Sequence, residues 1–172
     1  MSITRKVAFT GMGIALYVVL SMVAKIPVIA HISLDLGYIA FAVILYHIGV
    51  IPGTIVGAAG CVLVSLLTTG WFPPGWLVGN IVIGLMCGLL IQRDGTWQAT
   101  IINVFVCVVA VGIGILGLKT LIECHLYGIP LMVKLPKNAV AFAMDAVVMS
   151  AGMVFAQRGP IVKVYARLRK GD

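Results

Sequence analysis

One carboxylate lies deep in an apolar stretch near the end of the chain. Asp145 stands seven residues from both Asn138 and Gly152, so the three residues fall on nearly one face of a helix. In a membrane helix a carboxylate costs at least about 2.5–3.5 kcal/mol, which a partner, a water-filled cavity or a ligand must offset. We predict that Asp145 binds a substrate, the alternative being a structural hydrogen bond to a neighbouring helix.

Other polar and aromatic side chains are candidates for the same site. We expect Asn80, Asn138 and Asp145 to face one outward cavity. Gly70–Trp76 contains two tryptophans and two prolines, and indoles on a rigid loop suit stacking on a flat heterocycle, although anchoring at the membrane surface is the alternative. Lys119, Lys134 and Lys137 could bind a carboxylate or phosphate; the alternative is that they cap helix ends or contact lipid headgroups. The predicted substrate-binding residues are Asp35, Tyr38, Trp71, Trp76, Asn80, Lys137, Asn138 and Asp145.

Sequence motifs for covalent catalysis, metal binding and ATP binding are absent. The chain has no HExxH, no GxSxG and no CxxC. Gly112–Thr120 approaches a phosphate-binding loop, but Leu118 separates Gly117 from Lys119, which that motif needs side by side. We therefore expect no enzyme activity, no cofactor and no metal, and any ATP-driven step would need another subunit.

A long charge-free stretch indicates that the chain crosses a lipid bilayer several times. The 57 residues from Leu36 to Gln92 include no Asp, Glu, Lys or Arg. Charged residues make up 10% of the chain and its mean hydropathy is +1.16, whereas a soluble domain carries about 25% charge. The basic residues form no patch interleaved with aromatics, which argues against a nucleic-acid partner.

Six apolar stretches of helical length divide the chain, which we predict to be a single domain, residues 1–172. The predicted fold is an all-α membrane protein with transmembrane helices at about 7–24, 36–51, 54–69, 77–92, 98–118 and 138–157. The first stretch is longer than the apolar part of a signal peptide, so we expect it to be retained. Pro52-Gly53 and Arg93–Thr96 are the expected tight turns, and Lys119–Lys137 is the expected long loop.

The distribution of Lys and Arg predicts both termini in the cytoplasm. With six helices, eight of the twelve basic residues fall on the side of the termini, as the positive-inside rule requires. The long, chemically varied loops then face outward, where we expect a capture site.

Small residues recur at helical spacing and allow helices to approach closely. Gly84 and Gly88 form a GxxxG pair in the fourth stretch, and packing within the bundle explains most such positions. Gly11 and Ala15 in the first stretch could instead dock a partner subunit.

Three segments in this order resemble the S component, the substrate-binding membrane subunit, of energy-coupling factor (ECF) vitamin transporters. The segments are Leu34–Ala40, Ile48–Gly60 and Phe72–Gly88. The resemblance implies a six-helix bundle in the bacterial plasma membrane that binds a vitamin or related micronutrient near its outer face. It also implies docking on an ECF module of one transmembrane subunit and two ATPases, through an Ala-x-x-x-Ala motif whose place is taken here by Gly11 and Ala15.

We therefore expect the substrate-capture subunit of an ATP-driven importer for a small, water-soluble aromatic or heterocyclic nutrient. The resemblance assigns no particular vitamin, because ligands differ between members. A stand-alone ion-coupled secondary transporter for a small organic solute is the main alternative. An intramembrane enzyme using Asp145 and a structural subunit without a ligand are the others.

Overall fold

The computed structural model describes residues 2–23, 27–29, 32–33 and 35–159, and most of these residues are helical. Within these ranges four helices are long and apolar enough to cross a membrane, and two further apolar helices are shorter. Six apolar helices agree with the predicted helical membrane fold. Lys25 and the basic tail beyond Gly159, which entered the predicted topology, lie outside the described residues.

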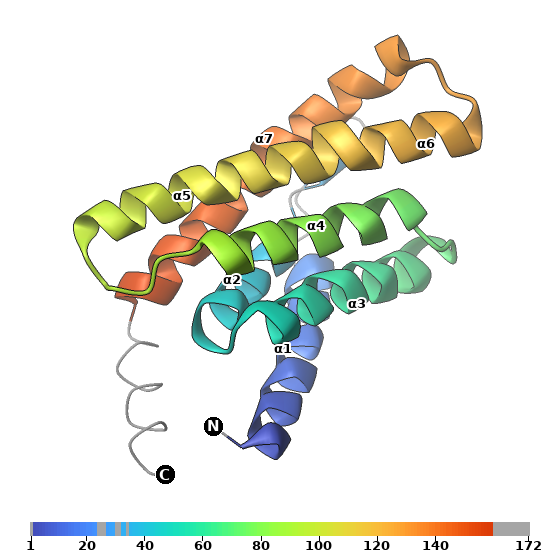
Figure 1. The fold of residues 1–172 in the computed structure, drawn as a ribbon. Helices are drawn as coiled ribbons and strands as arrows, with labels where there is room; N and C mark the ends of the chain where they lie inside the picture. Colours follow the sequence, from blue (N-terminus) through green and yellow to red (C-terminus); the bar gives the residue numbers. More distant parts are fainter. Residues whose placement is uncertain (1, 24–26, 30–31, 34, 160–172) are drawn as a thin grey trace.

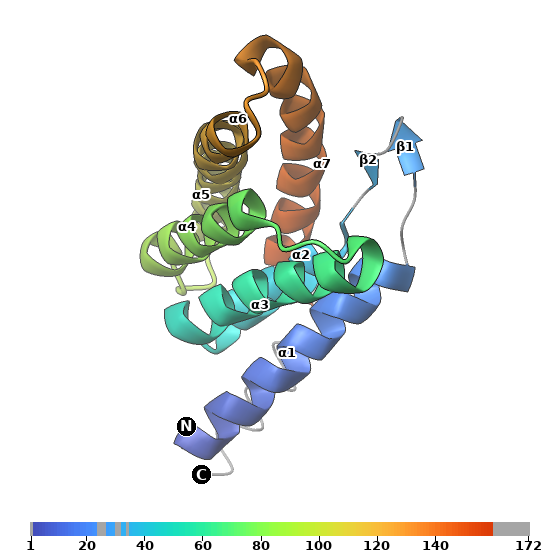
Figure 2. The ribbon, with the colours of Figure 1, turned by 90° about the vertical axis from the view of Figure 1, so that its right-hand side faces the viewer.

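Helices follow one another along the chain (Figure 1), and one small pair of strands lies between the first two (Figure 2). In chain order the elements are α1 (Ile3–Val23), β1 (Pro27–Ile29), β2 (Ile32–Ser33), α2 (Gly37–His47), α3 (Val50–Thr69), α4 (Pro74–Leu90), α5 (Trp97–Gly112), the π-helical segment η1 (Ile113–Lys119), α6 (Thr120–Tyr127) and α7 (Leu131–Arg158). The strands β1 and β2 pair antiparallel, with Pro27 opposite Ser33.

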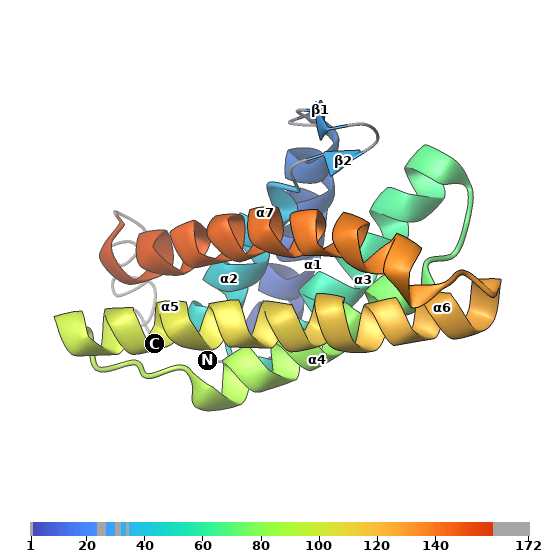
Figure 3. The ribbon, with the colours of Figure 1, turned by 90° about the horizontal axis from the view of Figure 1, so that it is seen from above.

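The short helix α2 is the centre of the bundle. It packs against α1, α3 and α7, while α3 packs on α4 and α5 packs on α7. Figure 2 shows α1 crossing one edge of the bundle on a diagonal, and Figure 3 shows α7 running beside the rod formed by α5 and α6. Three buried aromatic rings join α1 to α2: the Tyr38 centroid lies 6.2 Å from that of Tyr17 and 5.9 Å from that of Phe41.

The GxxxG pair in α4 allows α3 to lie against it. A methyl group added at Gly84 would stand 2.6 Å from Thr54 Oγ1, and one at Gly88 would stand 2.9 Å from Val50 Cα. Neither position has room for a side chain, so the glycines set the distance between the two helices.

The turn between the second and third helices falls earlier than predicted. It lies at Ile48-Gly49, and Pro52 and Gly53 belong to the first turn of α3. Gly49 has φ 126° and ψ −174°, a conformation open essentially to glycine alone. Proline is tolerated within the first helical turn, where its missing N–H is unpaired in any helix. The proline that suggested a break therefore begins a helix.

The predicted long loop Lys119–Lys137 is also wrong, because most of it is helical. One continuous helical rod runs from Trp97 to Tyr127, and α7 begins at Leu131. Gly128, with φ 62°, ends the rod in a left-handed conformation. The widened π-helical segment η1 lies in the middle of the rod, and such segments are frequent at functional sites.

The predicted break between the fourth and fifth helices is present, and other helix ends differ by a few residues. α4 ends at Leu90 and α5 begins at Trp97, where Thr96 Oγ1 accepts a hydrogen bond of 3.1 Å from Ala99 N. The 11 residues of α2 rise only about 16 Å, about half the hydrocarbon thickness of a bilayer. The second predicted span is therefore shorter than a full crossing.

Candidate functional site

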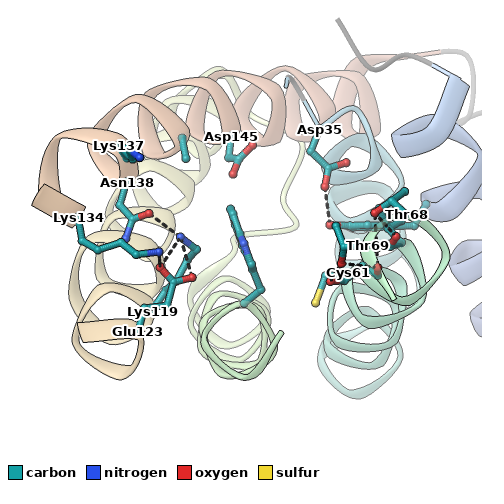
Figure 4. A pocket seen from close by; sticks show the side chains of 15 residues that line it. Asp35, Cys61, Thr68, Thr69, Lys119, Glu123, Lys134, Lys137, Asn138 and Asp145 are labelled. Carbon is teal, nitrogen blue, oxygen red and sulfur yellow. Dashed lines mark hydrogen bonds and ion pairs between the residues drawn. The ribbon is translucent and has the colours of Figure 1, made fainter. Parts of the chain in front are cut away.

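A polar cavity of about 470 Å³ opens between α1, α3, α4, the α5–α6 rod and α7 (Figure 4). It lies toward the end of the bundle where α3 ends and α4 begins, because Thr68, Thr69 and Trp76 line it. Its volume falls within the range of about 300–1,000 Å³ typical of small-molecule sites. The lining residues are Tyr17, Asp35, Cys61, Val64, Ser65, Thr68, Thr69, Trp76, Lys119, Glu123, Lys134, Lys137, Asn138, Ala141 and Asp145.

One wall of the cavity, which we call the lysine-rich wall, is a network of charged and amide side chains centred on Glu123. Its members are Lys119, Glu123, Lys134 and Asn138. The Glu123 carboxylate lies 3.3 Å from Lys119 Nζ and 2.8 Å from Lys134 Nζ. Only 4% of the Lys119 side chain and 10% of the Glu123 side chain are exposed. One carboxylate is thus shared by two ammonium groups, so this wall keeps an excess of positive charge.

Asn138 connects this network to the end of η1. Lys119 Nζ donates a hydrogen bond to Asn138 Oδ1, and Asn138 Nδ2 donates to Thr120 Oγ1 at 2.8 Å. Thr120 Oγ1 itself donates to the Ile115 carbonyl five residues earlier, at 2.8 Å. The widened backbone of η1 therefore positions Lys119 and Thr120 together against α7.

Trp76 adds an aromatic surface next to the lysines. Lys119 Nζ lies 4.3 Å from the centre of the Trp76 ring system, within the range of a cation–π contact. Asn80, one turn further along α4, donates from Nδ2 to the Trp76 carbonyl at 3.0 Å. The indole is partly buried and lines the cavity, so a flat ligand could stack on it.

Asp35, on the opposite side of the cavity, ties α1 to the start of α2. Its carboxylate accepts hydrogen bonds from Tyr17 Oη at 3.1 Å, from Ser21 Oγ, and from Gly37 N at 2.9 Å. Because both carboxylate oxygens have donors within the fold, Asp35 contributes to the structure as well as to the lining.

Asp145 and Lys137 also line the cavity, but neither side chain has a hydrogen-bond or ion-pair partner among the described residues. Asp145 is 3% exposed, and no hydrogen bond or ion pair joins it to any described residue. Lys137 is exposed and likewise has no ion pair among the residues described. Figure 4 shows Asp145 between the lysine-rich wall and Asp35.

The structure brings together five of the eight predicted substrate-binding residues. Asp35, Trp76, Lys137, Asn138 and Asp145 all line the cavity.

Three predicted residues do not line it. The Trp71 side chain is 78% exposed, although the Trp71 carbonyl accepts a hydrogen bond of 2.9 Å from the lining residue Ser65. Tyr38 and Asn80 are fully buried, beside each other and near Cys61. Tyr38 Oη and Asn80 Oδ1 make no hydrogen bond of good geometry within the described part of the chain. These two side chains thus lie in the packed interior, behind the cavity wall.

Sequence reasoning named Lys119 and Lys134 as possible contacts for a carboxylate or phosphate, but it did not predict their shared contact with Glu123 or their place in helices. Lys119, Glu123 and Lys134 were assigned to a loop, since charged residues interrupt an apolar pattern there. The spacing of four residues between Lys119 and Glu123 was the available signal, because such a pair lies on one face of a helix. Nothing in the pattern indicated that Lys134 on α7 pairs with Glu123.

The two small residues predicted to dock a partner lie on the outside of α1. Gly11 and Ala15 are both exposed, and no atom lies within 4 Å of a methyl group added at Gly11. Gly13, between them, is buried and faces Ile44 and Val56. The outer face of α1 is therefore uncovered by the described part of the bundle.

Comparison with known proteins confirms the resemblance noted in the sequence. The family model described as "ECF-type riboflavin transporter, S component" matches residues 1–166. Two curated relatives, a UPF0397 protein and the UPF0397 protein str0306 from two strains of Streptococcus thermophilus, are each 31% identical over 85 residues. These matches cover 49% of this chain and 47% of each relative, so the chain spans about half the length of the curated relatives it matches.

Proposed function

Because this chain belongs to the family of ECF-type riboflavin transporter S components, we propose that it is the substrate-capture subunit of a micronutrient importer. S components are transport subunits and not enzymes, and the chain is a multi-pass protein of the cell membrane. The proposed ligand is a small, water-soluble aromatic or heterocyclic compound. The observation that carries this proposal is a polar cavity with an indole in its wall, inside a bundle of apolar helices.

The cavity is proposed to open to the outside of the cell. Arg93 and Arg158 lie at the opposite end of the bundle: Arg93 Nε donates to the Tyr46 carbonyl at 3.0 Å, and Arg158 stacks 4.7 Å from the Trp97 ring. A basic end of this kind is the cytoplasmic one by the positive-inside rule.

The packing of α1 supports the same orientation. Gly13 faces Ile44 and Val56, whereas Tyr17, one turn later, lies against Gly37 and Gly60. The beginning of α1, with Arg5 and Lys6, therefore points toward the basic end. A ligand would enter from the side away from these cations.

Release of the ligand into the cell is proposed to depend on a separate ECF module that hydrolyses ATP. The sequence contains no complete phosphate-binding loop, so ATP hydrolysis would take place in another subunit. The uncovered face of α1 around Gly11 and Ala15 is the proposed contact with the transmembrane coupling subunit.

The proposal is tested by identifying what the protein holds. The protein is purified in mild detergent and denatured, and the released small molecules are identified by mass spectrometry. A stoichiometric aromatic or heterocyclic nutrient is the expected result. A protein that releases nothing, and whose tryptophan fluorescence does not respond to water-soluble vitamins, would contradict the capture role.

Transport in reconstituted vesicles separates this proposal from an ion-coupled carrier. Vesicles containing the chain together with an ECF module and internal ATP should accumulate the ligand, and vesicles with the chain alone should not. Accumulation by the chain alone under a proton or sodium gradient would favour the secondary transporter.

A further inference from the structure

We infer that the cavity binds an amphoteric ligand. This inference rests on the proposed function and specifies its substrate class. Such a ligand presents an amine or other N–H donor with positive character to Asp145, and a carboxylate or phosphate to Lys137. The geometry that carries this inference is one cavity whose lining holds a carboxylate and an ammonium on the same helix, neither of which forms an ion pair with a described residue.

The first step is the state of Asp145. Asp145 is only 3% exposed, and it lines the cavity. No described residue donates a hydrogen bond to its carboxylate or forms an ion pair with it. A carboxylate in this position is costly unless a donor reaches it. The described fold supplies none, so the ligand is the proposed donor.

Asp35 is the weaker candidate for the same ligand group. Its two carboxylate oxygens already accept hydrogen bonds from Tyr17, Ser21 and Gly37. Asp35 and Asp145 both line the cavity, but of the two only Asp145 accepts no hydrogen bond from a described residue.

The second step is the charge balance of the lysine-rich wall. Glu123 is shared between Lys119 and Lys134, which leaves one positive charge over, and Lys137 adds another. An anionic group on the ligand would neutralise this excess by charge-assisted hydrogen bonds. The lining is thus positive at one pole and negative at the other (Figure 4).

The third step is the distance between the two poles. Lys137 and Asp145 are eight residues apart on α7, which corresponds to a rise of about 12 Å. The Lys137 side chain is long and flexible, so a ligand that bears the amine and the anionic group on one ring could reach both residues. Trp76 lines the same cavity and supplies a face for the ring.

A set of four compounds on one pyridine ring tests the inference directly. Pyridoxamine 5′-phosphate carries both the amine and the phosphate, pyridoxamine only the amine, pyridoxine 5′-phosphate only the phosphate, and pyridoxine neither. Riboflavin, which is neutral, is the fifth probe. Binding to the whole purified protein in detergent is measured by isothermal titration calorimetry.

The expected order of affinity is set by the charged groups. The compound with both groups should bind at least tenfold more tightly than either compound with one, and riboflavin should bind more weakly than the compound with both. Riboflavin as the tightest probe would leave the capture role standing and overturn the amphoteric inference, since Asp145 would then hold a proton. Equal affinities across the set would also overturn it, as would no binding by any probe, whereas the capture role is decided by the release experiment.

Two variants that each remove one charge then assign the poles. Asp145→Asn should weaken pyridoxamine 5′-phosphate at least tenfold and leave pyridoxine 5′-phosphate unchanged, whereas Lys137→Gln should weaken both phosphates and spare pyridoxamine. Asp94→Asn and Lys6→Gln, exposed residues that do not line the cavity, are the controls and should change nothing. A loss that is the same for every probe would mean a purely structural role and would overturn the assignment.

Discussion

Lys119, at the end of the π-helical segment η1, donates a hydrogen bond to Asn138 on α7, so a buried ammonium and a buried amide join two helices in the wall of the cavity. Asn138 in turn donates to Thr120, so its amide holds both residues at the end of η1. This relationship links the wide backbone of η1 to the positive wall of the site.

Replacing Asn138 with Leu should destabilise the protein by about 1–3 kcal/mol, because Lys119 loses an acceptor in a buried position. The loss is read as a lower midpoint of thermal unfolding in detergent. Gln98→Leu, at an exposed position near the start of α5, is the control and should leave the midpoint within error. An unchanged midpoint for Asn138→Leu would mean that water replaces the amide.

Replacing Glu123 with Gln should cost about 3 kcal/mol, because it leaves Lys119 buried without its carboxylate. Adding Lys134→Gln should restore part of the loss, since one of the two competing positive charges is then removed. A double-mutant cycle on unfolding midpoints measures the coupling. Strictly additive effects would show that the three side chains do not act as one network.

Replacing Asp145 with Asn should raise the stability of the ligand-free protein. The change keeps the shape and removes a buried charge that has no partner within the described residues, a charge that costs about 2.5–3.5 kcal/mol in a membrane helix. Asp145→Asn should therefore lower ligand affinity while it raises the unfolding midpoint of the ligand-free protein, a trade-off that is common at functional sites. A lower midpoint without ligand would indicate that Asp145 supports the fold.

Replacing Gly49 with Ala should destabilise the protein by about 1–3 kcal/mol through backbone strain alone. The glycine has φ 126°, and no atom lies within 4 Å of the added methyl group. Gly117→Ala is the matched control, since its methyl group also meets no atom within 4 Å and its backbone is helical. The control should be neutral or slightly stabilising; equal losses would exclude strain as the cause.

Trp71, in the α3–α4 connection, and Trp76, in the first turn of α4, should differ in their effect on ligand affinity. Trp76→Leu should weaken binding about tenfold, because an aromatic surface in the cavity is lost. Trp71→Leu should have little effect, since its ring is 78% exposed and does not line the cavity. Affinities are compared by titration with the compound that the protein releases, and the reverse order would place the site at the Trp71 loop.

Much of the helical architecture could be predicted because hydropathy and glycine spacing are local properties of the chain. The charge-free stretch from Leu36 to Gln92 indicated membrane helices, and the break at Arg93–Thr96 is present between α4 and α5. The spacing of Asn138 and Asp145 placed them on one face of a helix, and both line the cavity. The predicted position of a turn between helices was wrong where the backbone conformation of one residue decided it, as at Gly49.

By itself, the sequence determined that the chain is a bundle of apolar helices with a carboxylate on one inner face, because periodicity and composition act within each helix. Only the tertiary structure decided that Lys119 and Glu123 belong to a helical rod. Charged residues can be buried there because a neighbouring helix supplies an oppositely charged side chain. Lys134 on α7 meets Glu123 eleven residues away along the chain, and the packing of α7 against the rod creates that contact. Tertiary packing likewise separated Trp76, in the cavity wall, from the exposed Trp71 five residues before it.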